Sequence, residues 1–175
     1  MKESSVISVI TTLLAVPSLL LSQARVSNTS ASSPSRVEEV LTSLAGNWYF
    51  DLYSPGATAA VASGQREMRL LRDSTKLAWT ETFAGQGDVG SGLLGYNSAT
   101  GAYYILGAYT HKSDPLVLIG RADSSGRTLR FDPLDVTSRP GTLVSSEIRL
   151  VDAEHFEWAA SDGSWRAVFT RIGRS

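Results

Sequence analysis

The sequence has no cysteine and only two histidines among its 175 residues. Without cysteine no disulfide bridge can form, so the fold must be held by its hydrophobic core alone. The two histidines, His111 and His155, cannot build a multi-histidine metal site, and at most one of them could ligate a haem. We therefore expect no metal site and no bound cofactor.

Basic clusters and catalytic motifs are also missing. The chain has 16 Lys and Arg against 17 Asp and Glu, which gives a formal charge of −1 at pH 7. A nearly neutral domain without a basic patch attracts phosphate backbones poorly, so we expect no nucleic-acid partner. Neither a Ser/His/Asp order nor a serine elbow is present, which makes an enzyme a less favoured class than a binding protein.

The long apolar run of the chain is at its N-terminus. Residues 6–21 are mainly apolar, but Pro17 interrupts them. A spanning helix needs about 20 apolar residues, so this run is too short and too broken to cross a membrane. Residues 22–24 then supply the small residues that a signal peptidase recognises. We predict that residues 1–24 are a signal peptide and that the mature protein is periplasmic or secreted, without membrane association. A retained N-terminal anchor is the alternative.

A polar segment and a short helix follow the predicted cleavage site. Residues 25–35 are rich in Ser, Thr and Asn and have little to bury, so we expect a disordered tether. Ser35 and Glu38 have the spacing of a capping box at a helix N-terminus. The apolar residues that then recur at helical spacing are Val37, Val40, Leu41 and Leu44. We predict an amphipathic helix that ends at Gly46 and covers one end of the fold.

The rest of the chain has the pattern of an all-β fold. Short segments rich in β-branched and aromatic residues alternate with turn residues. The candidate strands lie near residues 47–54, 64–72, 76–84, 88–96, 102–110, 115–122, 127–133, 142–151, 154–160 and 164–171. Between them there is no helix long enough for a parallel crossover, so the sheet should be antiparallel. For residues 36–175 we predict a closed antiparallel up-and-down barrel of about eight to ten strands.

Two short motifs resemble those of a known family. Residues 46–48 form a Gly-x-Trp motif at the start of the first strand, and Arg171 ends the last strand. Together with the glycine-rich run 90–96, these features make the chain similar to the lipocalins and related calycins, and to an uncharacterised lipocalin-like bacterial domain family. The resemblance covers residues 37–171. It implies that Arg171 packs across Trp48 where the barrel closes. A closed barrel independently allows this contact, because its first and last strands are neighbours and Trp48 and Arg171 can then meet at one end.

The glycines at 90, 92 and 95 have the spacing of a dinucleotide-binding motif. That motif works only where a strand turns into a helix, whereas the residues around these glycines indicate a strand. In a barrel strand, glycine more often marks a bulge or a sharp bend. We therefore do not expect nucleotide binding.

One predicted strand carries a possible functional group. Leu77, Trp79, Glu81 and Phe83 alternate along one of its faces. If Trp79 and Phe83 point inward, Glu81 does too, and its carboxylate then needs a partner or a shifted pKa. Glu81 is therefore the main candidate for a functional group. The alternative is that this face is the outer one, near a rim.

Binding of a small apolar or aromatic ligand in the lumen is the function that we favour, because aromatic residues occur on most strands. The predicted ligand-binding residues are Trp79, Glu81, Phe83, Tyr104 and His155, and the predicted closure residues are Trp48 and Arg171. A barrel filled by side chains, acting as a structural or interaction protein, is the main alternative. The others are a haem-binding barrel of the nitrobindin type and a small-molecule enzyme that uses Glu81, Glu157 and His155. The protein should be a monomer or a homodimer.

Overall fold

The computed structural model describes residues 33–72, 75–85, 87, 89–110, 112, 114–134 and 144–173. The predicted signal peptide, residues 25–32 of the predicted tether, and His111 lie outside the described residues. The elements are α1 (Pro34–Leu44), β1 (Gly46–Tyr53), β2 (Ala62–Leu70), β3 (Lys76–Phe83), β4 (Val89–Asn97), β5 (Ala102–Tyr109), β6 (Leu116–Ala122), β7 (Thr128–Pro133), β8 (Ser146–Leu150), β9 (His155–Ala160) and β10 (Arg166–Arg171).

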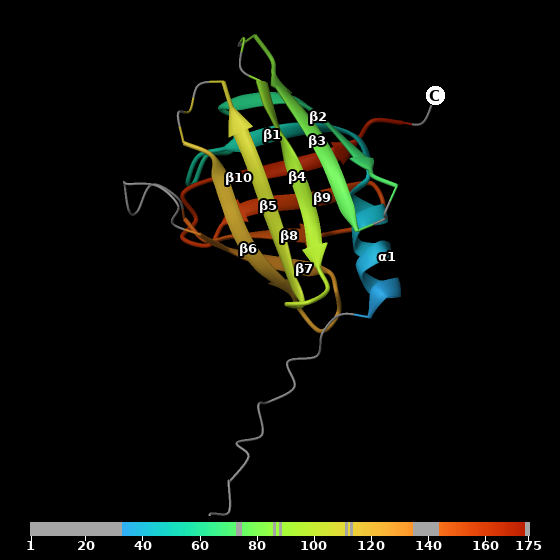
Figure 1. Ribbon diagram of the computed structural model, residues 1–175. Helices are drawn as coiled ribbons and strands as arrows, with labels where there is room; N and C mark the ends of the chain where they lie inside the picture. The colour runs from blue at the N-terminus through green and yellow to red at the C-terminus, as the bar shows by residue number, and fades with distance from the viewer. Residues whose placement is uncertain are drawn as a thin grey trace, which may run out of the picture. The chain divides into compact units, whose positions relative to one another are not determined.

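The strands form a closed antiparallel barrel, as predicted (Figure 1). Each strand pairs with its neighbours in chain order, and β1 pairs with β10 to complete the ring of ten strands. Alternation along the strands decides which side chains are inside. In β2, for example, Gly64, Arg66 and Met68 are buried, whereas Gln65 and Glu67 are exposed.

The helix covers one end of the barrel through the predicted apolar stripe. Val37, Val40, Leu41 and Leu44 are all at most 3% exposed. The predicted start of the helix is wrong, because α1 begins at Pro34 with Ser33 as its N-cap, and no side chain caps it. Proline fits the first helical position since its missing N–H would have no partner there. The helix therefore begins within the segment 25–35 that was expected to be a tether.

The Gly-x-Trp motif and Arg171 meet where β1 pairs with β10. Cζ of Arg171 lies 4.1 Å from the Trp48 ring centroid, and its Nη1 donates to the Ala45 carbonyl at 2.8 Å. Nε1 of Trp48 donates to the Leu44 carbonyl at 2.9 Å, which joins the barrel to the helix. Gly46 has a φ of 137°, and a Cβ there would collide with the Arg171 guanidinium. Glycine is thus required for both its conformation and its size.

Large aromatic side chains fill the interior close to this junction. Trp48 packs edge to face on Phe156, with ring centroids 4.7 Å apart, and Phe156 stacks on Phe169 at 4.2 Å. Elsewhere in the interior, Tyr103 on β5 and Phe131 on β7 are also buried, each 1% exposed. Trp48, Phe156, Tyr103 and Phe131 do not line the pocket and belong to the packed core.

Candidate functional site

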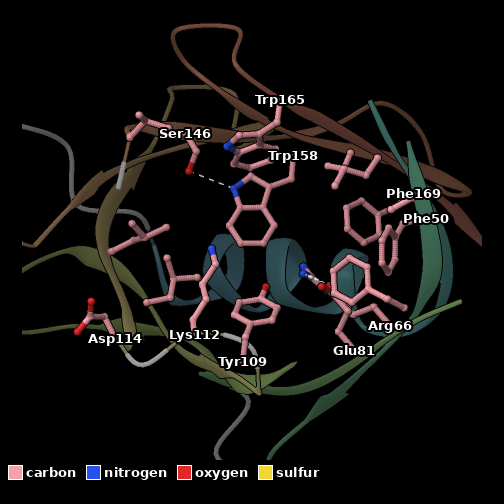
Figure 2. A pocket seen from close by; sticks show the side chains of 17 residues that line it. Phe50, Arg66, Glu81, Tyr109, Lys112, Asp114, Ser146, Trp158, Trp165 and Phe169 are labelled. Atoms are coloured by element: carbon pink, nitrogen blue, oxygen red, sulfur yellow. Dashed lines mark hydrogen bonds and ion pairs between the residues drawn. The ribbon is translucent and has the colours of Figure 1, made fainter. Parts of the chain in front are cut away.

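The barrel contains an open pocket of about 550 Å³. Figure 2 looks into it, with α1 crossing the background. Its apolar lining consists of Phe50, Leu52, Ala62, Phe83, Leu116, Leu118, Val144, Trp158, Trp165, Ala167 and Phe169. The polar residues of the lining are Arg66, Glu81, Tyr109, Lys112, Asp114 and Ser146. The size and the mainly apolar surface are those of a small-molecule site, for which about 300–1,000 Å³ is usual.

Small side chains leave this space open. Leu52 on β1 has Ala62 of β2 on one side and Ala167 of β10 on the other, and all three line the pocket. The barrel also has ten strands, which gives a wider interior than the roughly eight strands whose lumen side chains can fill. The interior is therefore filled near α1 and hollow beyond it.

One wall of the pocket carries a buried ion pair. Arg66 on β2 and Glu81 on β3 are opposite each other in the ladder and are 5% and 4% exposed. Nε and Nη2 of Arg66 both contact Oε2 of Glu81. Of the two orientations left open for this strand, the structure has the inward one, because Trp79 and Glu81 are buried and Phe83 lines the pocket. Arg66 is the partner that a buried carboxylate requires.

Three aromatic rings surround the Arg66 guanidinium. Its Cζ lies 5.0 Å from the ring centroid of Trp79, 5.0 Å from that of Trp158 and 4.9 Å from that of Phe169. A cation over an aromatic face is attracted by the ring quadrupole, most strongly where water is excluded. The rings thus stabilise the charge within an apolar wall and fix the position of the side chain.

Tyr109 on β5 completes the polar wall. Burial raises the pKa of its hydroxyl from 10.0 to about 12, whereas the charge of Arg66 lowers this pKa and that of Glu81 raises it. The hydroxyl therefore keeps its proton at physiological pH, and it is hydrogen-bonded to Arg66 and Glu81. Its side chain points into the pocket (Figure 2).

Trp158 and Ser146 contribute a second polar contact. Nε1 of Trp158 donates to Oγ of Ser146 at 3.1 Å, and this hydroxyl belongs to a residue that is only 2% exposed (Figure 2). Trp158 also packs edge to face on Trp165, with ring centroids 5.6 Å apart. Two tryptophans that line the pocket can report on its occupancy by fluorescence.

Lys112 and Asp114 add two exposed charges to the lining. Nζ of Lys112 lies 5.6 Å from the Tyr109 ring centroid. Among the described residues that line the pocket, the positive charges of Arg66 and Lys112 match the negative charges of Glu81 and Asp114. The lining therefore has no formal net charge.

Trp79 faces the interior, but Arg66 lies between its ring and the pocket space. It is 3% exposed and is not one of the residues that line the pocket. Its indole lies against Gly92 of β4 and Gly107 of β5, where a Cβ would collide with the ring. The glycine-rich run is a strand, as predicted. Gly92 is needed because the absence of a side chain leaves room for the Trp79 ring, and not because the strand has a bulge or a bend there.

Tyr104 and His155 lie on the outer face of the barrel. Tyr104 follows Tyr103, and His155 precedes Phe156, and these two neighbours are each 1% exposed inside the barrel. His155 instead contacts Asp152, with Nδ1 and Oδ1 2.9 Å apart. The prediction that they line the lumen is wrong, because adjacent residues of a strand point to opposite faces.

Glu157 also lies outside, where it forms an ion pair with Arg149 of β8. Neither Glu157 nor His155 is therefore close to Glu81 in the lumen. The acid–base group considered as an alternative, with these three residues together in the lumen, does not form in the described part of the chain.

Arg66 is absent from the predicted site residues, although the sequence contains a signal for it. Two predicted strands joined by a short turn must pair antiparallel. Pairing Leu70 with Leu77 across that turn places Arg66 opposite Glu81, as observed. The inward position of Glu81 thus predicts that of Arg66.

No protein-family model matches the chain, and no curated protein matches it either. The described residues contain no group of three or more His, Asp or Glu side chains that could hold a metal ion. Within the same residues, no helix is long and apolar enough to cross a membrane. The pocket is therefore the basis on which a function can be argued.

Proposed function

We propose that the chain is an exported, lipocalin-like protein that binds one small, mainly apolar ligand in the barrel. The observation that carries this proposal is the pocket of about 550 Å³ with its aromatic and aliphatic lining. A ligand that buries about 300 Å² of apolar surface there would gain roughly 7.5 kcal/mol. This free energy corresponds to a dissociation constant in the low micromolar range before ordering costs are subtracted.

The alternatives fit the described residues less well. A barrel that acts only through its outer surface gives no reason for a hollow interior lined by Trp158 and Trp165. A haem site needs a histidine in the lumen, but His155 is on the outer face and His111 lies outside the described residues.

Binding can be tested by titrating a panel of small apolar and aromatic ligands while the tryptophan emission is recorded. We expect a saturable change at one site per chain. Trp158→Phe should reduce the optical change but largely preserve affinity, because most of the ring surface survives.

A variant that fills the pocket separates lumen binding from surface binding. Ala167→Phe places a ring in the space beside Leu52 and should weaken binding at least about tenfold. Ala108→Phe adds the same ring on the exposed outer face and is the matched control. Equal affinity of the two variants, or a panel in which no ligand saturates, would contradict the proposal.

A further inference from the structure

The polar groups deep in the pocket include both donors and an acceptor. Arg66 directs Nε and Nη2 to one oxygen of Glu81, so its Nη1 and the second carboxylate oxygen are not used in this pair. The protonated hydroxyl of Tyr109 faces the same space and is itself hydrogen-bonded to Arg66 and Glu81. Arg66 has more N–H donors than the pair uses, so a ligand group that reaches this wall meets N–H donors beside a carboxylate acceptor.

Stability gives little reason for such a pair. The desolvation of two buried charges often exceeds their mutual attraction, and apolar residues of the same volume are commonly as stable. An apolar pocket, in contrast, orients its ligand through a few well-placed polar groups. The position of Arg66 and Glu81 in the lining makes the pair such a group.

The charges of the pair oppose ionised ligands. Because Glu81 already neutralises Arg66, a carboxylate at this wall would meet a like charge without gaining an unpaired cation. An ammonium group would meet the same problem at Arg66. Either ion would also lose its hydration in an apolar pocket, whereas a neutral group with a donor and an acceptor would lose much less.

Lys112 is the lining residue that could favour an acid instead. It is exposed, and Asp114 adds an opposite charge to the same lining. An ion pair between Lys112 and a ligand carboxylate would be in contact with water and would contribute little, because solvent screens it. The buried pair should therefore dominate the choice of ligand.

We infer that the ligand carries a neutral polar group with both an acceptor and a donor, such as a carboxamide, held by Arg66 and Glu81. Glu81 is then the residue that excludes carboxylates. This inference rests on the proposed binding function and specifies the ligand class for the same pocket.

The test uses ligands that differ only in the polar group, on a decyl and on a 2-naphthyl scaffold. Each scaffold is compared as the hydrocarbon, the carboxylate, the alkylammonium and the carboxamide, by calorimetry or by tryptophan emission. We expect the carboxamide to bind at least about tenfold more tightly than either ion. A carboxylate that binds best, or equal affinity for all four, would overturn the inference and leave the binding function standing. If no member bound on either scaffold, the result would count against the binding function itself.

Charge removal at Glu81 sharpens the test. Glu81→Gln leaves the Arg66 charge without its carboxylate, so the affinity for the carboxylate relative to the carboxamide should rise at least about tenfold. Glu157→Gln removes a carboxylate from the outer face and should leave the ratio unchanged. A shifted ratio in Lys112→Met but not in Glu81→Gln would place the selecting charge at Lys112 and refute the inference. If Glu81→Gln does not fold, the order of the four ligand affinities measured on the unmodified protein still tests the inference.

Discussion

Breaking the Arg66–Glu81 pair should cost far more stability than replacing it. Glu81→Leu leaves a buried guanidinium without its carboxylate, and the pair is only 5% and 4% exposed. The loss of one partner of such a pair costs about 3–5 kcal/mol in the free energy of unfolding. Arg66→Met should cost a similar amount, because it strands Glu81 and removes the cation from three aromatic rings.

The double variant Arg66→Met/Glu81→Leu should recover most of this loss. Neither charge remains buried, so we expect a stability within about 1 kcal/mol of the unmodified protein, or above it. The coupling in the double-mutant cycle should then be about 5 kcal/mol or more. Urea unfolding followed by tryptophan emission measures each value from the midpoint, provided that the slope stays constant.

The Arg149–Glu157 pair is the matched control for this cycle. These side chains are 56% and 20% exposed on the outer face, so solvent screens their interaction. Their coupling should not exceed about 1 kcal/mol. If the Arg66/Glu81 double variant lost as much stability as the sum of its single variants, the pair would be needed for the fold. A role in ligand selection would then lose its basis.

Three further outcomes are expected. Trp48→Ala should cost about 3–5 kcal/mol as a large buried ring, Arg171→Ala less, and their double-mutant cycle in urea should be non-additive because the groups touch. The pKa of Tyr109 is raised from 10.0 to about 12, so the folded state retains a proton that the unfolded state loses. Stability should therefore fall as the pH rises through this interval, and Tyr109→Phe should make the fall in thermal melts shallower. The mass of the exported protein should match a chain that begins at Arg25, and a product that keeps residues 6–21 would contradict the predicted cleavage.

The fold could be predicted because its signals are local. Turn residues separate segments with period-two alternation, and each segment is one strand of the barrel to within a few residues at most ends. The largest difference is at β8, which begins at Ser146 instead of residue 142, and residues 135–143 lie outside the described part. The helix start was missed because Ser35–Glu38 imitates a capping box, whereas Pro34 begins the helix.

The site could be predicted only in part, because the direction of a side chain depends on the alternation along its whole strand, and the size of the pocket depends on several strands. Tyr103 and Tyr104 are adjacent and aromatic, so composition cannot say which of them points inward. The decision comes from Ile105, Gly107 and Tyr109, which share a face with Tyr103. The hollow interior is a sum of side-chain volumes across strands, and no single segment contains that information.

The most direct measurement of the central claim locates a bound ligand by NMR on protein with labelled alanine methyl groups. The best ligand of the panel should shift the signals of Ala62 and Ala167, which line the pocket, in proportion to occupancy. The signal of Ala108, exposed on the outer face, should stay in place. Saturable shifts at Ala108 without shifts at Ala62 and Ala167 would show that the ligand binds outside the barrel, and the account would be wrong.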